Sequence, residues 1–360
     1  MLRILKPFPR AAAFVVLCAA VCVAQKMPKT TRIWSVGPLT QSARTMGITL
    51  GTKGARLNGP LVSPETGSVF AATRSIAFAG ERVVLASMVG LRNIEGAQIP
   101  ESVYDLISLD ARTGEVKDRR EVQAFGSVKV FATNEAHVIV SGRSVVRLTP
   151  DLKEAGTFDT RDVGNHWRVE NISPDGSTLG NATRPGFELI DVRTLQARRL
   201  SDKTVSDTSV SSKAAVSDSP LWIRDYPKAS SFVTLTDEFG QHLIFHGSCG
   251  GRPQFLRDDR ILLAACKAAR ILDLSGATLK TIDSHEPVSF AGVSQNGSRF
   301  ALQFSGRRER FVIYSVDSAE PIAEVAAEQA PQAQSWTAFS PDGTMIVVGS
   351  PQKLTLYRLP

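Results

Sequence analysis

Short apolar runs, each ending in or next to aspartate, recur at a nearly constant interval along the chain. They are typical of β-strands, because apolar side chains alternate with polar ones over a few residues. Successive copies are roughly 40 residues apart, and residues 354–359 (LTLYRL) supply a seventh copy where the interval predicts one. The six aspartates are Asp110, Asp151, Asp191, Asp237, Asp273 and Asp317. The chain is therefore predicted to repeat one structural unit.

A tight turn precedes most of these runs. Ser-Pro-Asp-Gly occupies residues 173–176 and 340–343, and Ser-Gln-Asn-Gly occupies 294–297. In such a turn serine accepts a local hydrogen bond, proline fixes φ at about −65°, and glycine takes the positive φ needed to re-enter a strand. Variants of the turn lie at 79–81, 133–135 and 257–259. An apolar alternating segment follows each turn, which predicts a β-hairpin.

Four strands in each unit of about 40 residues predict the blade of a β-propeller. The expected fold class is all-β, with about seven four-stranded blades in a single ring. The last unit lacks a fourth strand, and residues 32–36 (RIWSV) are the simplest segment to supply it and close the ring. We expect a signal peptide at 1–24, the closing strand and a connector at 25–74, and the propeller at 75–360.

The Ser-Pro-Asp-Gly turns, each followed by an apolar strand and a strand ending in aspartate, resemble the blade repeats of bacterial TolB-like and WD-repeat-like propellers. The resemblance covers roughly residues 75–360 and implies the propeller fold. No blade carries the Trp-Asp dipeptide of the eukaryotic WD repeat. Because this group includes binding scaffolds, enzymes and domains attached to peptidases, the resemblance implies no particular activity.

The first residues have the pattern of a secretory signal peptide. Three basic residues and no acid precede the apolar run 11–23, and small residues stand where signal peptidase reads them, so we expect cleavage between Ala24 and Gln25. The run is shorter than the roughly 20 residues that span a bilayer, which argues against a membrane anchor. Val21 is too large for the residue before a lipidated Cys22. The sequence predicts a secreted or periplasmic protein with no membrane span after cleavage.

Cleavage also changes the net charge and the cysteine content. The formal charge of +7 falls to +4 when the leader and its three basic residues are removed. A mildly basic exported protein is compatible with an anionic partner, whereas nucleic acid is not expected outside the cytoplasm. Cys249 and Cys266 remain, and an oxidising compartment allows them to form a disulfide. Two buried thiols are the alternative.

No catalytic or metal-binding motif stands out. His242 and His246 are about 13 Å apart along a predicted strand, too far to share a metal ion. The sequence has no Gly-x-Ser-x-Gly elbow, and the glycine-rich segment 246–251 lacks the lysine and helix of a phosphate loop. We therefore expect no cofactor and no metal. Trp222 and Tyr226 lie in a segment that interrupts the blade pattern, which makes it a candidate contact loop.

Propeller topology sorts the loops of each blade onto two faces. The turns between first and second strands and between third and fourth strands share one face, which collects acidic residues because aspartate favours turns. These acids include Glu81, Asp110, Glu135, Asp151, Asp175, Asp191, Asp237, Asp258, Asp259, Asp273, Asp317 and Asp342. The loops between second and third strands bring basic residues to the other face. The candidate binding face consists of Arg92, Arg143, Arg184, Arg224, Tyr226, Lys267, Arg307, Arg308 and Arg310, with Lys353 nearby.

These patterns predict a monomeric binding or assembly module rather than an enzyme. The expected partner is an acidic protein, a glycan or an envelope component that meets the basic face. The alternative is an enzyme of the lactonase-like or quinone-dependent dehydrogenase-like type, which would use the central funnel. Titratable groups that converge at the funnel mouth would favour the enzyme, and a funnel lined by small apolar groups would favour the binding module.

Overall fold

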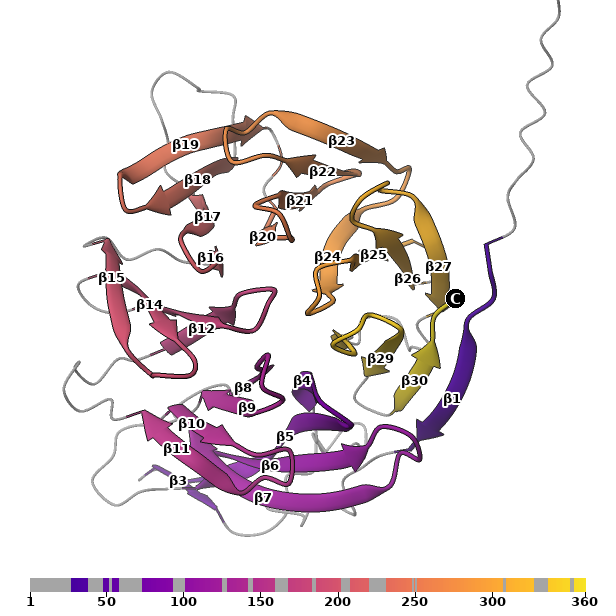
Figure 1. Cartoon of the computed structure of the whole chain (residues 1–360). Coiled ribbons are helices and arrows are strands. Elements are labelled where there is room, and N and C mark those ends of the chain that lie inside the picture. Colours follow the sequence, from indigo (N-terminus) through magenta and orange to yellow (C-terminus); the bar gives the residue numbers. More distant parts are fainter. Residues whose placement is uncertain are drawn as a thin grey trace, which may run out of the picture.

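Seven four-stranded antiparallel sheets form a ring within the described residues (Figure 1). The computed structural model describes residues 27–37, 48–51, 54–57, 73–92, 101–124, 128–141, 145–158, 168–182, 186–201, 208–219, 231–247, 249, 251–306, 309–326, 336–349 and 353–360. The first strand of each blade lies nearest the centre of the ring and the fourth lies at the rim (Figure 1). The predicted all-β propeller of seven blades is confirmed.

Six of the blades are built from four strands that are consecutive in the sequence. Blade 1 contains β4 (Thr73–Ala79), β5 (Arg82–Arg92), β6 (Glu101–Asp110) and β7 (Val116–Ala124). Blade 2 contains β8 (Lys129–Ala132), β9 (Val138–Ser141), β10 (Val145–Leu148) and β11 (Glu154–Phe158). Blade 3 contains β12 (Arg168–Ile172), β13 (Thr178–Ala182), β14 (Phe187–Asp191) and β15 (Ala197–Ser201).

The next three blades repeat this order. Blade 4 contains β16 (Thr208–Val210), β17 (Ala215–Ser219), β18 (Ser231–Asp237) and β19 (Gly240–Gly247). Blade 5 contains β20 (Pro253–Phe255), β21 (Ile261–Ala265), β22 (Ala268–Leu272) and β23 (Thr278–Asp283). Blade 6 contains β24 (Val288–Val293), β25 (Arg299–Phe304), β26 (Arg310–Ser315) and β27 (Pro321–Ala326).

Blade 7 joins two distant parts of the chain. It contains β28 (Trp336–Phe339), β29 (Met345–Gly349), β30 (Leu354–Arg358) and the N-terminal strand β1 (Thr31–Val36). Antiparallel pairing of β1 with β30 places Trp34 opposite Leu356. The predicted closure by the N-terminal strand is confirmed. Outside the blades, β2 (Ile48–Gly51) and β3 (Gly54–Leu57) pair with each other in the segment predicted to be a connector.

The closing strand also holds blade 7 against blade 1. The indole Nε1 of Trp34 donates a hydrogen bond to the carbonyl oxygen of Ala111, 2.9 Å away, in the turn between β6 and β7. The same ring covers Gly114, where φ is +75° and an added Cβ would lie 2.9 Å from the indole. Trp34 therefore links the last blade to the first through both a hydrogen bond and a close ring contact.

Apolar side chains pack between neighbouring blades rather than in one central core. In β5, Val84 and Ala86 pack toward blade 2, whereas Val83 and Leu85 pack toward blade 7. Each of the seven interfaces between blades contains such a buried cluster within the described residues. Because both faces of these sheets are covered, the middle strands are apolar on both sides, which explains the uninterrupted apolar runs in the sequence.

The turns that marked the repeat have the geometry that their residues predict. The Ser173 hydroxyl accepts the Thr178 amide at 2.9 Å, and the Ser340 hydroxyl accepts the Met345 amide at the same distance. Gly176 and Gly343 have φ values of +70° and +73°, which non-glycine residues seldom adopt. These local hydrogen bonds and positive φ values fix the hairpins that start each of these blades.

Candidate functional site

The loops of the ring are divided between two faces. We call the side with the turns between first and second strands and between third and fourth strands the turn face, and the opposite side the loop face. On the turn face, aspartates bond to their own turns: Asp110 accepts the amides of Arg112 and Thr113, and Asp191 accepts the amide of Thr194. The acidic residues of this face thus serve turn conformation, as their residue type predicts.

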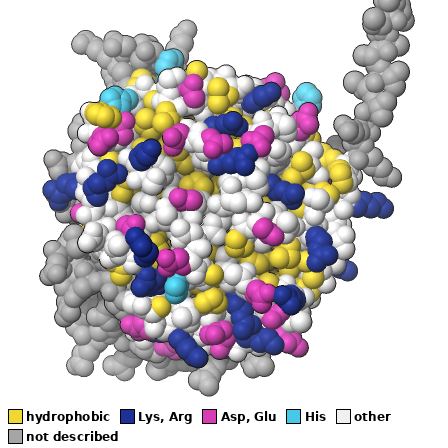
Figure 2. Space-filling view, in the orientation of Figure 1, with side chains coloured by type: hydrophobic (Ala, Val, Ile, Leu, Met, Phe, Trp, Pro, Cys, Tyr) yellow, Lys and Arg dark blue, Asp and Glu magenta, His cyan; other side chains and the backbone are white. Residues whose placement is uncertain are grey.

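Arginines on or near the turn face reach from one blade to the turns of the next. Arg82 of blade 1 lies 3.2 Å from the carboxylate of Asp151 in blade 2, and Arg257 of blade 5 pairs with Asp317 in blade 6. Other arginines donate to backbone carbonyls of the following blade: Arg147 to Val192 and Arg193, Arg198 to Ser212 and Lys213, Arg260 to Val316, and Arg299 to Pro360. Figure 2 shows one face of the molecule, on which cationic and anionic side chains are interspersed.

Hydrogen-bond donors hold several turn carboxylates in the charged form. The Thr113 amide, followed by that of Arg112, lowers the pKa of Asp110. The Thr194 amide lowers the pKa of Asp191, and the hydroxyl of Ser275 lowers the pKa of Asp273. In each case the donor stabilises the carboxylate relative to the protonated acid.

These lowered pKa values predict that acid destabilises the ring. A carboxyl with a lower pKa in the folded state than in the unfolded state favours folding above its unfolded pKa of about 3.9, and this contribution is lost as the pH falls toward the folded value. We expect the free energy of unfolding, measured by urea titration at about pH 7, 4.5 and 3, to fall below about pH 5. Asp191→Asn should make this decline shallower, and an unchanged free energy at about pH 3 would contradict the prediction.

Most of the predicted basic face lies outside the described residues. These residues are Arg143, Arg184, Arg224, Tyr226, Arg307 and Arg308, while Arg92 ends β5 and its side chain is not described. Lys267 is exposed in the turn between β21 and β22, and Lys353 directly precedes β30. Both lie at the loop face, where the topology of the blades predicts them.

Arg310 is engaged within its own blade and with the loop before it. Its guanidinium lies 3.1 Å from the carboxylate of Glu286, which precedes β24, and 3.8 Å from that of Glu324 in β27. It also lies over the ring of Phe304, 5.0 Å from the centroid. With two carboxylates and one aromatic ring as partners, Arg310 contributes little free charge for a partner molecule.

A cavity of 290 Å³ occupies the centre of the ring, between the innermost strands. Its walls include Phe78, Val130, Phe290 and Phe339, and its polar side chains are hydroxyls and carboxamides such as that of Asn171. Among the described residues that line it, none has a titratable side chain. General acid or base catalysis needs such a group within hydrogen-bond reach of the substrate.

Gln295, which lines this central cavity, lies at the turn face. There the carboxamide of Gln295 in blade 6 reaches across to Gly176 in blade 3, and a Cβ at Gly176 would lie 2.4 Å from its Nε2 atom. Gln295 Nε2 is buried, and no described residue accepts a hydrogen bond from it. The amide of Asn134 in blade 2 also lies 3.4 Å from the Gly176 carbonyl. Turns from three blades thus meet at this end of the funnel.

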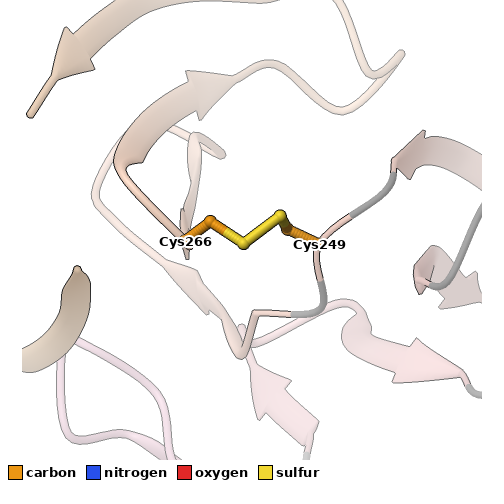
Figure 3. The surroundings of a disulfide bond; sticks show 2 residues. All are labelled: Cys249 and Cys266. Atoms are coloured by element: carbon orange, nitrogen blue, oxygen red, sulfur yellow. A yellow bond between two sulfur atoms is a disulfide. The ribbon is translucent and has the colours of Figure 1, made fainter. Parts of the chain in front are cut away.

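Cys249 and Cys266 form a disulfide, with their Cα atoms 5.9 Å apart (Figure 3). Cys249 lies in the segment that enters blade 5, and Cys266 begins the turn after β21. Two residues after Cys249, the backbone of Gly251 packs closely against β21, because a Cβ at Gly251 would lie 2.2 Å from the carbonyl oxygen of Ala264. The bridge therefore fastens the incoming segment to the second strand of blade 5.

A second cavity lies beside the disulfide at the edge of the loop face, and the sequence analysis did not find it. This blade 4–5 pocket has a volume of 330 Å³ and lies between β19 of blade 4 and the β21–β22 hairpin of blade 5. Three of its lining residues, His246, Lys267 and Arg270, have basic side chains. Arg270 and Phe245 looked like ordinary strand residues in the sequence, so only the alignment of two blades brings this set together.

The histidines do not gather with other ligands in the described part of the chain. His242 lies 3.5 Å from the carboxylate of Asp237 at the hairpin of β18 and β19. Among the described residues, no group of three histidine, cysteine, aspartate or glutamate side chains is placed to hold a metal ion. Within the described part of the chain, no helix is long and apolar enough to cross a membrane.

The sequence was also compared with known proteins. No family model matches it, and no match is found among curated proteins. The class of this protein is given by its fold, which is a seven-bladed β-propeller.

Proposed function

We propose that this propeller is an exported binding or assembly module for an acidic protein, a glycan or an envelope component, and that it is not an enzyme. The observation that carries the proposal is the funnel, whose described walls consist of apolar and neutral polar side chains. A lactonase-like or quinone-dependent dehydrogenase-like propeller would instead need groups in its funnel that move protons or bind a cofactor.

Two features support export. The first residues have the charged and apolar pattern of a cleaved leader, although they lie outside the described residues. The Cys249–Cys266 disulfide is of a kind that persists in oxidising compartments and is rare in the cytosol. These features, and the Ser-Pro-Asp-Gly turns, favour a relationship with the TolB-like and WD-repeat-like propellers of bacteria.

The distribution of charge favours the loop face as the partner surface. On the turn face, ion pairs and backbone carbonyls engage arginines such as Arg82, Arg257 and Arg299. The sequence places basic residues in the second-to-third-strand loops, and the adjacent Arg307 and Arg308 are expected to give a local positive potential there. Such a potential accelerates and orients the approach of an acidic partner more than it adds affinity.

Binding of poly-L-glutamate, with neutral dextran as the comparison, tests the proposal. We expect saturable binding of the polyanion only, weakened by about tenfold or more between about 50 and 300 mM NaCl. Arg307→Ala with Arg308→Ala should weaken it severalfold, whereas Arg193→Ala with Lys213→Ala, which removes two exposed charges from the turn face, should not. Equal binding of dextran, or indifference to salt, would contradict the proposal.

The structure changes the role expected of Arg310 in this test. Because Arg310 pairs with Glu286 and Glu324, replacing it leaves two carboxylates near each other at one end of blade 6. The triple replacement of Arg307, Arg308 and Arg310 would therefore mix a loss of stability with a loss of binding. The double replacement separates the two effects.

A further inference from the structure

Arg270 differs from the other half-buried arginines of the described chain. Seven others form an ion pair or donate to a carbonyl oxygen: Arg82, Arg120, Arg147, Arg257, Arg260, Arg299 and Arg310. The guanidinium of Arg270 instead lies over the ring of Phe245 in the neighbouring blade, 5.8 Å from its centroid. No carboxylate among the described residues pairs with it. A half-buried guanidinium without an anion is costly to desolvate unless a ligand supplies one.

The blade 4–5 pocket places further positive charge beside Arg270. Lys267 is exposed at its rim, and His246 lies in β19, the strand that forms its other wall, one residue before that strand ends. The described lining contains no acidic side chain. An acid of the same sheet, Asp283, pairs with Ala268 across the β22–β23 ladder and is exposed. Asp283 is therefore placed to weaken the positive potential without neutralising Arg270 directly.

The walls of the pocket fix these groups in position. Phe245 supports one side of the Arg270 guanidinium, and the Cys249–Cys266 disulfide forms part of the lining next to Lys267. An arginine held by an aromatic ring presents its planar fork of N–H donors with little loss of side-chain freedom on binding. That fork matches the two oxygens of a carboxylate.

We propose that the blade 4–5 pocket binds the carboxylate of an acidic residue of the partner, with Arg270 as its main contact and Lys267 as a second. This inference rests on the proposed function, since it assigns a specific site on the loop face to the acidic partner. The pocket is concave and partly enclosed by blades 4 and 5, so its cations act in a less polar environment than those of an exposed loop.

Calorimetric titration of the whole protein with acetyl-Gly-Glu-Gly-Glu-Gly-amide tests the site. We expect saturable binding, absent for the same peptide with glutamine in place of glutamate. Arg270→Gln should weaken it by about tenfold or more, since a charge-assisted contact is lost, and Lys267→Gln should weaken it severalfold. Arg193→Gln on the turn face is the matched control and should leave binding unchanged. Asp283→Asn should tighten it.

The outcomes separate this inference from the proposed function. Equal affinity of Arg270→Gln, Arg193→Gln and the unaltered protein would overturn the site, as would binding of inorganic phosphate without binding of the acidic peptide. If poly-L-glutamate still binds in a salt-sensitive manner in those cases, the proposed function stands and only the pocket assignment fails. Should Arg270→Gln fail to fold by circular dichroism, Lys267→Gln decides the question, because its exposed side chain is not part of the core.

Discussion

Replacing Trp34 by alanine is expected to lower the free energy of unfolding by about 3 kcal/mol, a loss typical of removing a large, partly buried aromatic ring. The replacement removes the hydrogen bond from the indole to the Ala111 carbonyl and the ring contact with Gly114. Both contacts cross from blade 7 to blade 1, so the variant weakens the interface that the closing strand forms with blade 1. Urea unfolding followed by circular dichroism measures the change.

Two further variants divide this loss between its causes. Trp34→Phe keeps an aromatic ring near Gly114 but lacks the indole donor, and we expect it to cost about 1 kcal/mol. Gly114→Ala should be destabilising as well, because an added Cβ would meet the indole and because φ at this position is +75°. A Trp34→Ala protein as stable as the unaltered one would show that β1 closes the ring through backbone pairing alone.

Loss of the disulfide is expected to cost a similar amount. Cys249 and Cys266 are separated by 17 positions, and closing a loop of that size restricts the unfolded chain by about 3 kcal/mol. The double variant Cys249→Ala, Cys266→Ala should unfold at a correspondingly lower urea concentration than the oxidised protein. A double variant is needed, since a single replacement would leave a reactive thiol.

The reductant supplies the matched control for this prediction. Dithiothreitol should destabilise the unaltered protein by about as much as the double replacement does, and it should have no effect on the double variant. If the unaltered protein is equally stable with and without reductant, the bridge does not contribute as expected.

The ring could be predicted because its signals are local. Serine, proline and glycine in the 173–176 and 340–343 turns encode hairpins within a few residues, and a fixed interval turns hairpins into blades. Closure by residues 32–36 followed from the strand that was missing from the last blade. None of these inferences required knowledge of which side chains meet across the ring.

Contacts between blades could not be predicted in the same way. Arg270 and Phe245 belong to strands of different blades, and nothing in either strand indicates that they stack. The same is true of Trp34 and Gly114, which are 80 positions apart and were not paired by any pattern. Arg310 was predicted to belong to a partner surface because it falls in a basic loop of the sequence. In the structure it pairs with two acids that no pattern placed beside it, one from the loop before β24 and one from β27.

The pairing of β1 with β30 has a consequence for biogenesis. Ser35 and Thr355, whose hydroxyl oxygens lie 3.0 Å apart in this pairing, are 320 positions apart, so the strand that is made first must remain without its partner until nearly the whole chain has been made. Contacts between such distant residues form slowly, because a very long loop has to close before they gain any stability. Until then the free edge of β30 is open to strands of other molecules. A chaperone that shields this edge until the ring closes would therefore raise the yield of native protein.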